Sequence, residues 1–217
     1  MKKSAFCFLC IVLLAAAVSC SHGAKQIFTN ACDVGSVSHP GSCSFDSEQD
    51  MYTLTGAGVN LWGNTDACYF VWKKVTGDFS VSGVVKFEGE GVNPHRKIGF
   101  MIRESLAPDS RYADIAIHGD GLTSLQYRPV TGEITSEEKS AKVSKGETSI
   151  CLVRSGNRIA MRTSSGDPLP DSDDAAIEMD LPQECYVGLF ICSHEEDLKE
   201  TAYFSNVVLK QKKNYFS

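Results

Sequence analysis

The 217-residue sequence lacks features that several large classes of protein require. Beyond the first 20 residues no stretch has sustained helical periodicity, which argues against a helical or α/β fold. There is no Cys-x-x-Cys pair and no tight cysteine cluster, so a zinc site is not expected. The Gly-x-Ser-x-Gly, His-Glu-x-x-His, P-loop and dinucleotide-binding motifs are also absent. We therefore expect neither a resident metal ion nor an organic cofactor.

Positive charge is also in short supply. The chain has 21 Lys and Arg against 27 Asp and Glu, for a net charge of −6. Removing residues 1–19 would bring this to −8, because Lys2 and Lys3 would leave and no acidic residue would. An acidic protein without a basic block repels phosphate backbones, so nucleic acid is not an expected partner.

The N-terminus has the pattern of an export signal. Lys2 and Lys3 precede an apolar run over residues 6–18, which is shorter than the roughly 20 residues that span a bilayer. The end of the run, AAAVSC, resembles a bacterial lipoprotein box with Cys20 as the lipidated residue; the alternative is a plain signal peptide. Because the following SHGAK lacks acidic residues, we expect a lipid-anchored protein of the bacterial cell envelope that faces the periplasm.

This interpretation divides the chain into a signal peptide (1–19), an anchor and linker (20–32) and one folded domain (33–211). Six cysteines remain after the anchor: Cys32, Cys43, Cys68, Cys151, Cys185 and Cys192. An oxidising compartment permits disulfides among them. Cys32 and Cys43 flank a Gly/Ser/Pro-rich loop and are the first pair to test, whereas Cys151 and Cys192 lie in apolar runs typical of buried strands.

Short β-rich runs separated by Gly, Asn, Asp and Ser clusters fill the rest of the chain. Eleven such runs are expected to be strands: 51–56, 67–75, 78–87, 96–105, 111–118, 123–129, 148–155, 158–164, 176–181, 185–193 and 202–211. The turns GDG, TGE and SGN between them are typical of hairpins. This pattern predicts an all-β fold of two packed antiparallel sheets.

Three of these runs alternate in a way that points to a site. Alternate residues of a strand face opposite sides of the sheet, so Ile98, Phe100 and Ile102 face one side. If the three strands are neighbours, the other side presents Lys97, Arg103, Tyr112, Asp114, His118, Gln126 and Arg128 together, with the small Gly99 and Ala116 leaving room among them. An ordinary solvated sheet face also alternates. However, Arg, His, Gln, Tyr and Asp recognise ligands by fixed geometry, which favours a binding site.

The segments GEGVNPHRKIGFMIRESL, IHGDGLTSLQYR and GAGVNLWGNTDACYFVWKKVTGDFSV resemble the concanavalin A-like lectin/glucanase superfamily. Within it they are most similar to the DUF1349-type group, described as similar to "regulation of enolase protein 1" and also seen beside TolB-like domains. The resemblance covers residues 33–209 and implies a jelly-roll sandwich with one concave sheet face. In related folds that face binds or cleaves carbohydrate, although a fold by itself does not fix a function.

Aromatic residues suit a carbohydrate ligand. Trp62 lies with Asn60 and Asp66 in a segment expected at the rim of the cleft, where an indole could stack on a sugar ring. Core packing is the alternative for Trp62 and the expectation for Trp72.

Catalytic carboxylates are scarce. Glycoside hydrolysis usually needs two of them, and the glucanase signature of the superfamily is absent. Asp114 is the only carboxylate on the proposed face, and Glu88, Glu90 and Glu104 are more typical of solvated turns. The acidic run with Asp167, Asp171, Asp173 and Asp174 departs from the calcium-binding EF-hand pattern and is expected to be a solvated hairpin tip.

The sequence therefore predicts a membrane-anchored, non-catalytic carbohydrate-binding domain. Its expected ligand contacts are Trp62, Lys97, Arg103, Tyr112, Asp114, His118, Gln126 and Arg128. One alternative is a glycoside hydrolase or lyase for a saccharide, including an anionic one, with Asp114 or a rim Glu as base and His118 as acid. Another is an envelope module that binds a protein partner, which should display an exposed apolar patch.

Overall fold

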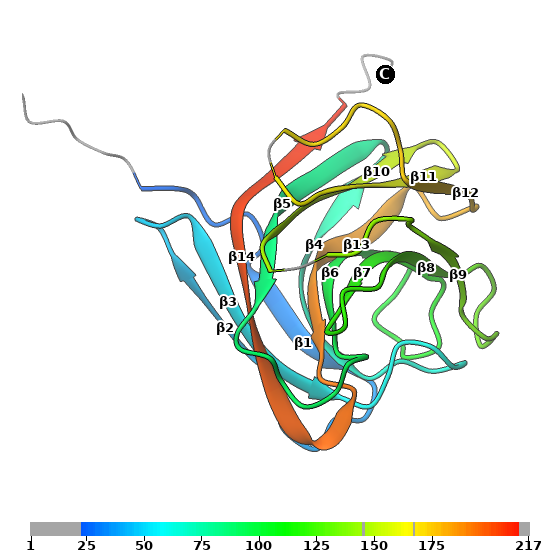
Figure 1. The fold of residues 1–217 in the computed structure, drawn as a ribbon. Coiled ribbons are helices and arrows are strands. Elements are labelled where there is room, and N and C mark those ends of the chain that lie inside the picture. The colour runs from blue at the N-terminus through cyan, green and yellow to red at the C-terminus, as the bar shows by residue number, and fades with distance from the viewer. Residues whose placement is uncertain (1–22, 145, 167, 213–217) are drawn as a thin grey trace, which may run out of the picture.

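The computed structural model describes residues 23–144, 146–166 and 168–212. They form two antiparallel sheets of seven strands that pack face to face (Figure 1). The predicted signal peptide, Cys20 and Asp167 lie outside the described residues. In the part that the structure describes, no helix is long and apolar enough to cross a membrane.

The first sheet, called the site sheet below, carries the three strands with the alternating pattern. In spatial order it consists of β1 (Asn30–Val34), β4 (Cys68–Thr76), β13 (Glu184–Cys192), β6 (Lys97–Arg103), β7 (Tyr112–His118), β8 (Thr123–Arg128) and β9 (Ser136–Lys139). The strands β6, β7 and β8 are sequential neighbours joined by short loops, as predicted.

The second sheet covers one face of the site sheet. In spatial order it consists of β12 (Ala175–Glu178), β11 (Arg158–Ser164), β10 (Thr148–Ser155), β5 (Phe79–Phe87), β14 (Glu195–Gln211), β3 (Met51–Gly58) and β2 (Ser42–Asp46). The prediction of an all-β, two-sheet antiparallel sandwich is confirmed.

Each of the eleven predicted strands is present, but β1, β2 and β9 were missed. All three are edge strands of four or five residues, and β9 has the wholly polar sequence SEEK. An edge strand pairs on one side only and does not need an apolar face, so its sequence carries little of the alternating signal. Because β1 begins at Asn30 and Phe28 is fully buried, the folded region begins a few residues before Asp33.

The main hydrophobic core fills the space between the two sheets. Ile98, Phe100 and Ile102 of β6 point into it, as their phase predicted, and Phe204 of β14 meets Phe100 with ring centroids 6.2 Å apart. A second hydrophobic cluster lies on the opposite face of the site sheet, where Leu61 packs with Phe70 and Phe190. That outer face is therefore covered by loops and is not an open solvated surface.

The six described cysteines are all free thiols. Cys32 packs against the outer cluster, whereas Cys43 packs against the core between the sheets. Cys32 thus lies on the outer side of the site sheet and Cys43 on its inner side, and the loop between them does not bring the two thiols together. Cys151 and Cys192 are buried in β10 and β13, as predicted.

Candidate functional site

The strand register brings the predicted polar side chains to one face of the site sheet. Lys97 lies opposite His118, and Asp114 lies opposite Gln126. Tyr112 lies between Arg103 on one neighbouring strand and Arg128 on the other. The phase argument was therefore correct, but these side chains divide into a sealed group and a group that lines a pocket, and Asp114 belongs to neither.

The sealed group is built around Asp66. Both Arg103 and Arg128 are fully buried, and each forms an ion pair with the fully buried Asp66, at 3.2 Å from Arg103 Nη2 and 2.6 Å from Arg128 Nη2. The remaining guanidinium N–H groups of the two arginines donate mainly to backbone carbonyls, including those of Ala107 and Gly63. The arginines thus fasten the loops 59–67 and 104–111 to the sheet, and their complete burial keeps them from contact with a ligand.

Tyr112 belongs to the same group. Its hydroxyl donates to the carbonyl of Leu61 at 2.9 Å and lies 3.0 Å from Thr135 Oγ1, and the Arg128 guanidinium lies 4.9 Å from its ring centroid. Its role in this structure is to hold the loops 59–67 and 129–135 against the sheet.

The room expected beside Gly99 does not exist. A Cβ at Gly99 would lie 1.7 Å from the carbonyl oxygen of Ile115 on the adjacent strand. Gly99 therefore allows two backbones to approach each other, and Ala116 packs in the outer hydrophobic cluster. Neither residue makes space for a ligand.

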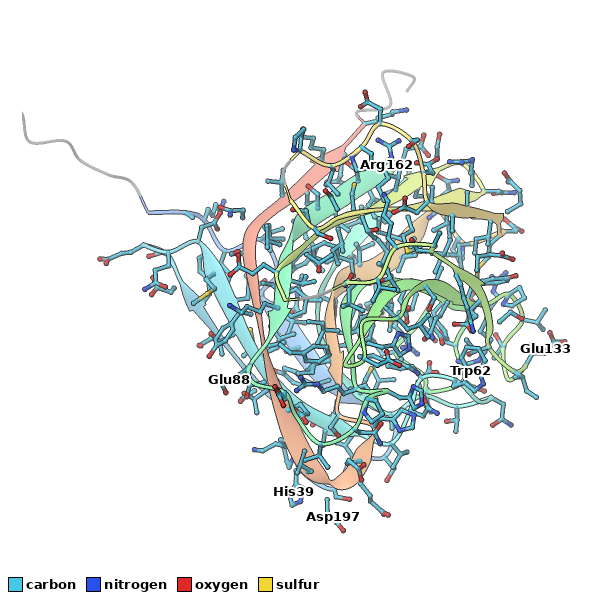
Figure 2. All side chains as sticks on the ribbon, viewed as in Figure 1. His39, Trp62, Glu88, Glu133, Arg162 and Asp197 are labelled. Carbon is cyan, nitrogen blue, oxygen red and sulfur yellow. The ribbon has the colours of Figure 1, made fainter. Side chains whose placement is uncertain are left out.

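The second group lines a pocket of about 290 Å³ beside the sealed arginines. Its walls are Asn60, Trp62, His95, Lys97, His118, Leu122, Gln126, Glu137, Lys139 and His194. Trp62 stands at the side of the molecule near the loop of Glu133 (Figure 2), and its indole is 37% exposed. The amide of Thr135 donates to the Trp62 carbonyl at 3.2 Å, which joins the two loops at the pocket edge. Of the eight predicted ligand contacts, four line this pocket: Trp62, Lys97, His118 and Gln126.

Lys97 supplies a buried positive charge to the pocket. Its side chain is only 3% exposed, its Nζ donates to Asn60 Oδ1 at 2.8 Å, and it lies 5.9 Å from the Trp62 ring centroid. Burial lowers the pKa of Lys97, while the neighbouring Asp114 opposes that shift. A desolvated ammonium of this kind attracts electronegative ligand atoms more strongly than an exposed one does.

His118 is neutral at physiological pH. Burial and, to a smaller extent, Lys97 lower its pKa to about 4. Its Nδ1 lies 2.9 Å from the carbonyl oxygen of Leu122, so in the neutral ring Nδ1 carries the proton and donates it. The other ring nitrogen, Nε2, is then left with a lone pair that can accept a hydrogen bond.

Gln126 and Asp114, on the same face, carry buried side-chain oxygens without hydrogen-bond partners among the described residues. Gln126 is 1% exposed, and its Oε1 has no hydrogen-bond partner among the described residues. Asp114 is fully buried, and neither of its carboxylate oxygens has a partner within the described chain. Burial raises the pKa of Asp114 well above its ordinary value, which Lys97 only partly offsets. Buried polar groups are normally hydrogen-bonded, so this cluster stands out from the rest of the fold.

Sequence reasoning missed His95 and His194 as pocket residues. Their rings lie 5.7 Å apart, and His95 lies 6.4 Å from His118, so three imidazoles surround the opening. His194 follows β13, where Cys192 pairs with Lys97. The signal was present in HRKIG, which places His95 two residues before Lys97, but the pairing of β13 with β6 was not predictable.

The other predicted carboxylates are engaged elsewhere. Glu104 receives two hydrogen bonds from Arg111, which lower the pKa of this carboxyl, and Glu88 accepts a hydrogen bond from Tyr203. Glu90 lines a separate pocket with Arg96. Asp66, expected at the rim, is instead the buried partner of the two arginines.

The acidic run is tied to neighbouring strands. Asp173 pairs with Arg158 and Arg162, and Asp174 accepts hydrogen bonds from Thr163. Among the described residues no group of three or more His, Cys, Asp or Glu is arranged to hold a metal ion. Asp173 and Asp174 thus hold the hairpin against β11 and do not extend freely into solvent.

Comparison by sequence identifies no family, because no protein-family model matches the chain and no curated protein is similar to it. Comparison of the fold is informative. A functionally unknown protein from Saccharomyces cerevisiae superposes with a TM-score of 0.64 at 15% identity, covering 84% of this chain and 96% of that one.

Two carbohydrate-active proteins share the fold. The alginate lyase AlgAT5 of polysaccharide lyase family 7 superposes with a TM-score of 0.54 at 12% identity, over 85% of this chain and 95% of that one. A mutant of the glycoside hydrolase family 43 protein BlXynB from Bacillus licheniformis gives 0.54 at 11% identity, over 79% of this chain but 38% of that one. This chain therefore has the jelly-roll sandwich fold of the concanavalin A-like type, and at such low identity the likeness establishes the fold alone.

Proposed function

We propose that the protein is a non-catalytic saccharide-binding domain of the DUF1349-type group, and that its ligand occupies the pocket between Trp62 and Gln126. The observation that carries the proposal is the combination of a part-exposed indole with the buried, unpartnered Oε1 of Gln126 on one pocket. A sugar ring offers an apolar face to an indole and hydroxyl donors to a carbonyl oxygen. The carbohydrate-active proteins that share the fold support this class of ligand.

The proposed ligand is polar and electron-rich. Lys97 provides a donor at the pocket wall, and the free Nε2 of His118 provides an acceptor. These roles replace the Arg103 and Arg128 contacts expected from sequence, since both guanidinium groups are fully buried and paired with Asp66. The buried ammonium of Lys97 favours an anionic over a neutral saccharide, whereas Lys139 is already paired with Glu137 at 3.1 Å.

We further propose that the domain is exported and anchored through Cys20 in the bacterial cell envelope, facing the periplasm. The described chain starts on the left of the view in Figure 1, and Trp62 lies on the right in the same view of Figure 2. This arrangement is compatible with an anchor that precedes residue 23 and does not cover the pocket.

The structure weakens the assignment of roles in the enzyme alternative. Because the pKa of His118 is about 4, its ring is neutral at pH 7, and its Nε2 holds no proton to give as a general acid. Asp114 does not line the pocket. Glu137 is the only carboxylate among the described residues lining it, whereas hydrolysis usually requires two. We therefore treat catalysis as the alternative, which the binding experiment below tests by looking for reaction products.

A protein partner is a second candidate, favoured by exposed apolar side chains on the two loops that a hydrogen bond from Thr135 to Trp62 joins. Val59 and Trp62 on one loop and Val130 and Ile134 on the other are 37–70% exposed. Contiguous exposed apolar side chains mark interaction sites. Ile134→Lys separates the two functions, because it alters this apolar surface without touching the pocket lining.

The test is a glycan array probed with the chain lacking residues 1–20, followed by calorimetry on each ligand and mass spectrometry for products. We expect binding without turnover, lost in Trp62→Ala and reduced at least tenfold in Gln126→Leu. Trp72→Phe is the matched control, since Trp72 packs against Tyr186 away from the pocket and should bind normally. No binding to any glycan would reject the proposal, and product formation would make the protein an enzyme.

A further inference from the structure

Two cysteines of the site sheet face each other on neighbouring strands. Cys68 begins β4 and Cys192 ends β13, and the register of these antiparallel strands pairs Tyr69 with Ile191. The next position along this register places Cys68 opposite Cys192. Both side chains are fully buried and pack in the same outer hydrophobic cluster, so they also share a face of the sheet.

Facing positions on antiparallel strands suit a disulfide. Directly opposed residues have Cα atoms about 4.5 or 5.5 Å apart, and disulfides span Cα separations of about 4.4–6.8 Å. The other four strand cysteines have no such partner. Their strand neighbours are Phe70 for Cys32, Leu54 for Cys43, Ser82 and Arg162 for Cys151, and Val75 for Cys185. The register therefore singles out one pair among the six described cysteines.

We propose that Cys68 and Cys192 form a cross-strand disulfide that joins β4 to β13 when the chain folds in an oxidising compartment. Each thiol gives up a proton and an electron as the S–S bond forms. The electrons reduce the disulfide of an external thiol–disulfide oxidant, such as oxidised glutathione or a protein dithiol oxidase, to two thiols. This proposal does not depend on whether the pocket binds a saccharide.

The bond must form before the loops cover the outer face of the site sheet. In the folded chain neither thiol is exposed, and the Cys192 thiol donates a hydrogen bond to the Gly58 carbonyl at 3.2 Å. Burial raises the pKa of Cys192 to about 11 and that of Cys68 well above its ordinary value. Because exchange requires a thiolate, the folded reduced chain should resist oxidation, and the folded disulfide should resist reduction.

The bond would also brace the pocket. Asp66, which holds the two arginines, lies two residues before Cys68, and His194 lies two residues after Cys192. A covalent link between these two strand ends would hold together the starts of the two segments that carry Asp66 and His194.

The experiment compares oxidation during and after folding. The full chain is reduced and unfolded, then refolded either in a glutathione redox buffer or in reductant, and the remaining free thiols are blocked with N-ethylmaleimide in denaturant. Chymotrypsin separates Cys43 from Cys68 at Trp62 and Cys185 from Cys192 at Phe190, so mass spectrometry can assign each linkage. After oxidative refolding we expect a crosslinked peptide that contains Cys68 and Cys192. When the chain is first folded in reductant and then placed in the glutathione buffer, we expect both cysteines to be recovered as blocked thiols.

The oxidised chain should melt roughly 5–15 °C above the reduced chain. The difference should vanish in a Cys68→Ser, Cys192→Ser double variant and persist in the control Cys151→Ser. If the double variant does not fold, peptide mapping of the natural chain still decides. Recovery of Cys68 and Cys192 as blocked thiols after oxidative refolding, or linked to other cysteines, would overturn the proposal.

Discussion

Arg128 and Asp66 form a two-point ion pair in the fully buried space beneath the loops of the site sheet. Arg128 Nη2 lies 2.6 Å from Asp66 Oδ1, and Nη1 lies 3.0 Å from Oδ2. Arg103 reaches Oδ2 from the neighbouring side at 3.2 Å, so one carboxylate serves two guanidinium groups. Residues that resembled ligand contacts are thus the support on which the pocket is built.

Asp66→Asn should therefore destabilise the fold. It leaves two buried arginines without a counter-charge, and breaking a buried pair costs about 3–5 kcal/mol. Urea unfolding at pH 7 measures the change. Glu184→Gln is the control, since it breaks a solvent-exposed pair with Lys74 and should change stability little. Equal, small losses in the two variants would show that the arginines are satisfied without Asp66.

Asp114→Asn, in contrast, should leave the fold as stable as the natural chain or make it more stable. The Asp114 carboxylate is buried without a hydrogen bond, and burial raises its pKa. A carboxyl whose pKa is raised by folding does not destabilise the fold at a pH below its unfolded-state pKa, where it is protonated in both states. The destabilisation grows as the pH rises and is complete above the folded-state pKa. The neutral amide removes that penalty, so the variant should match or exceed the natural chain by up to about 2 kcal/mol at pH 8.

Urea unfolding at pH 8 and pH 5 tests this expectation, and the advantage of Asp114→Asn should shrink at the lower pH. A loss as large as that of Asp66→Asn would mean that Asp114 is charged and held by Lys97. The two substitutions are chemically identical, so they isolate the effect of the surroundings.

The alternating pattern in the sequence was enough to predict the strands and the face they share. Ile98, Phe100 and Ile102 fill the core because a period of two fixes which side chains point inward. The same pattern cannot reveal what covers the outer face. Asp66 lies 37 residues from Arg103 and 62 from Arg128, and no local rule links a loop aspartate to strand arginines at those separations.

Gly99→Ala should destabilise the fold by about 1–3 kcal/mol or more, since the added methyl would meet the Ile115 carbonyl. Gly63→Ala is the control, because a Cβ there meets no atom within 4 Å, and its cost should stay near 0.5 kcal/mol. Chemical denaturation of both variants checks the prediction. A tolerated Gly99→Ala would show that β6 and β7 can separate and that this part of the face has room after all.

The lowered pKa of His118 predicts how the free energy of unfolding depends on pH. Its pKa is about 4 in the folded chain against 6.5 ordinarily, so the unfolded chain binds the proton more tightly. The stability that a neutral His118 contributes is fully present above pH 6.5, and it is lost as pH falls toward 4. The difference corresponds to about 3 kcal/mol.

His118→Gln removes this titration. Between pH 7.5 and pH 4 the natural chain should therefore lose about 3 kcal/mol more than the variant does, as measured by urea unfolding at each pH. Comparing the two chains cancels the contribution of the carboxylates, which titrate in both. Identical pH dependence, together with an NMR titration of the His118 ring near pH 6.5, would place this imidazole in contact with water. It would then be protonated at mildly acidic pH, and its Nε2 could not serve the ligand as an acceptor there.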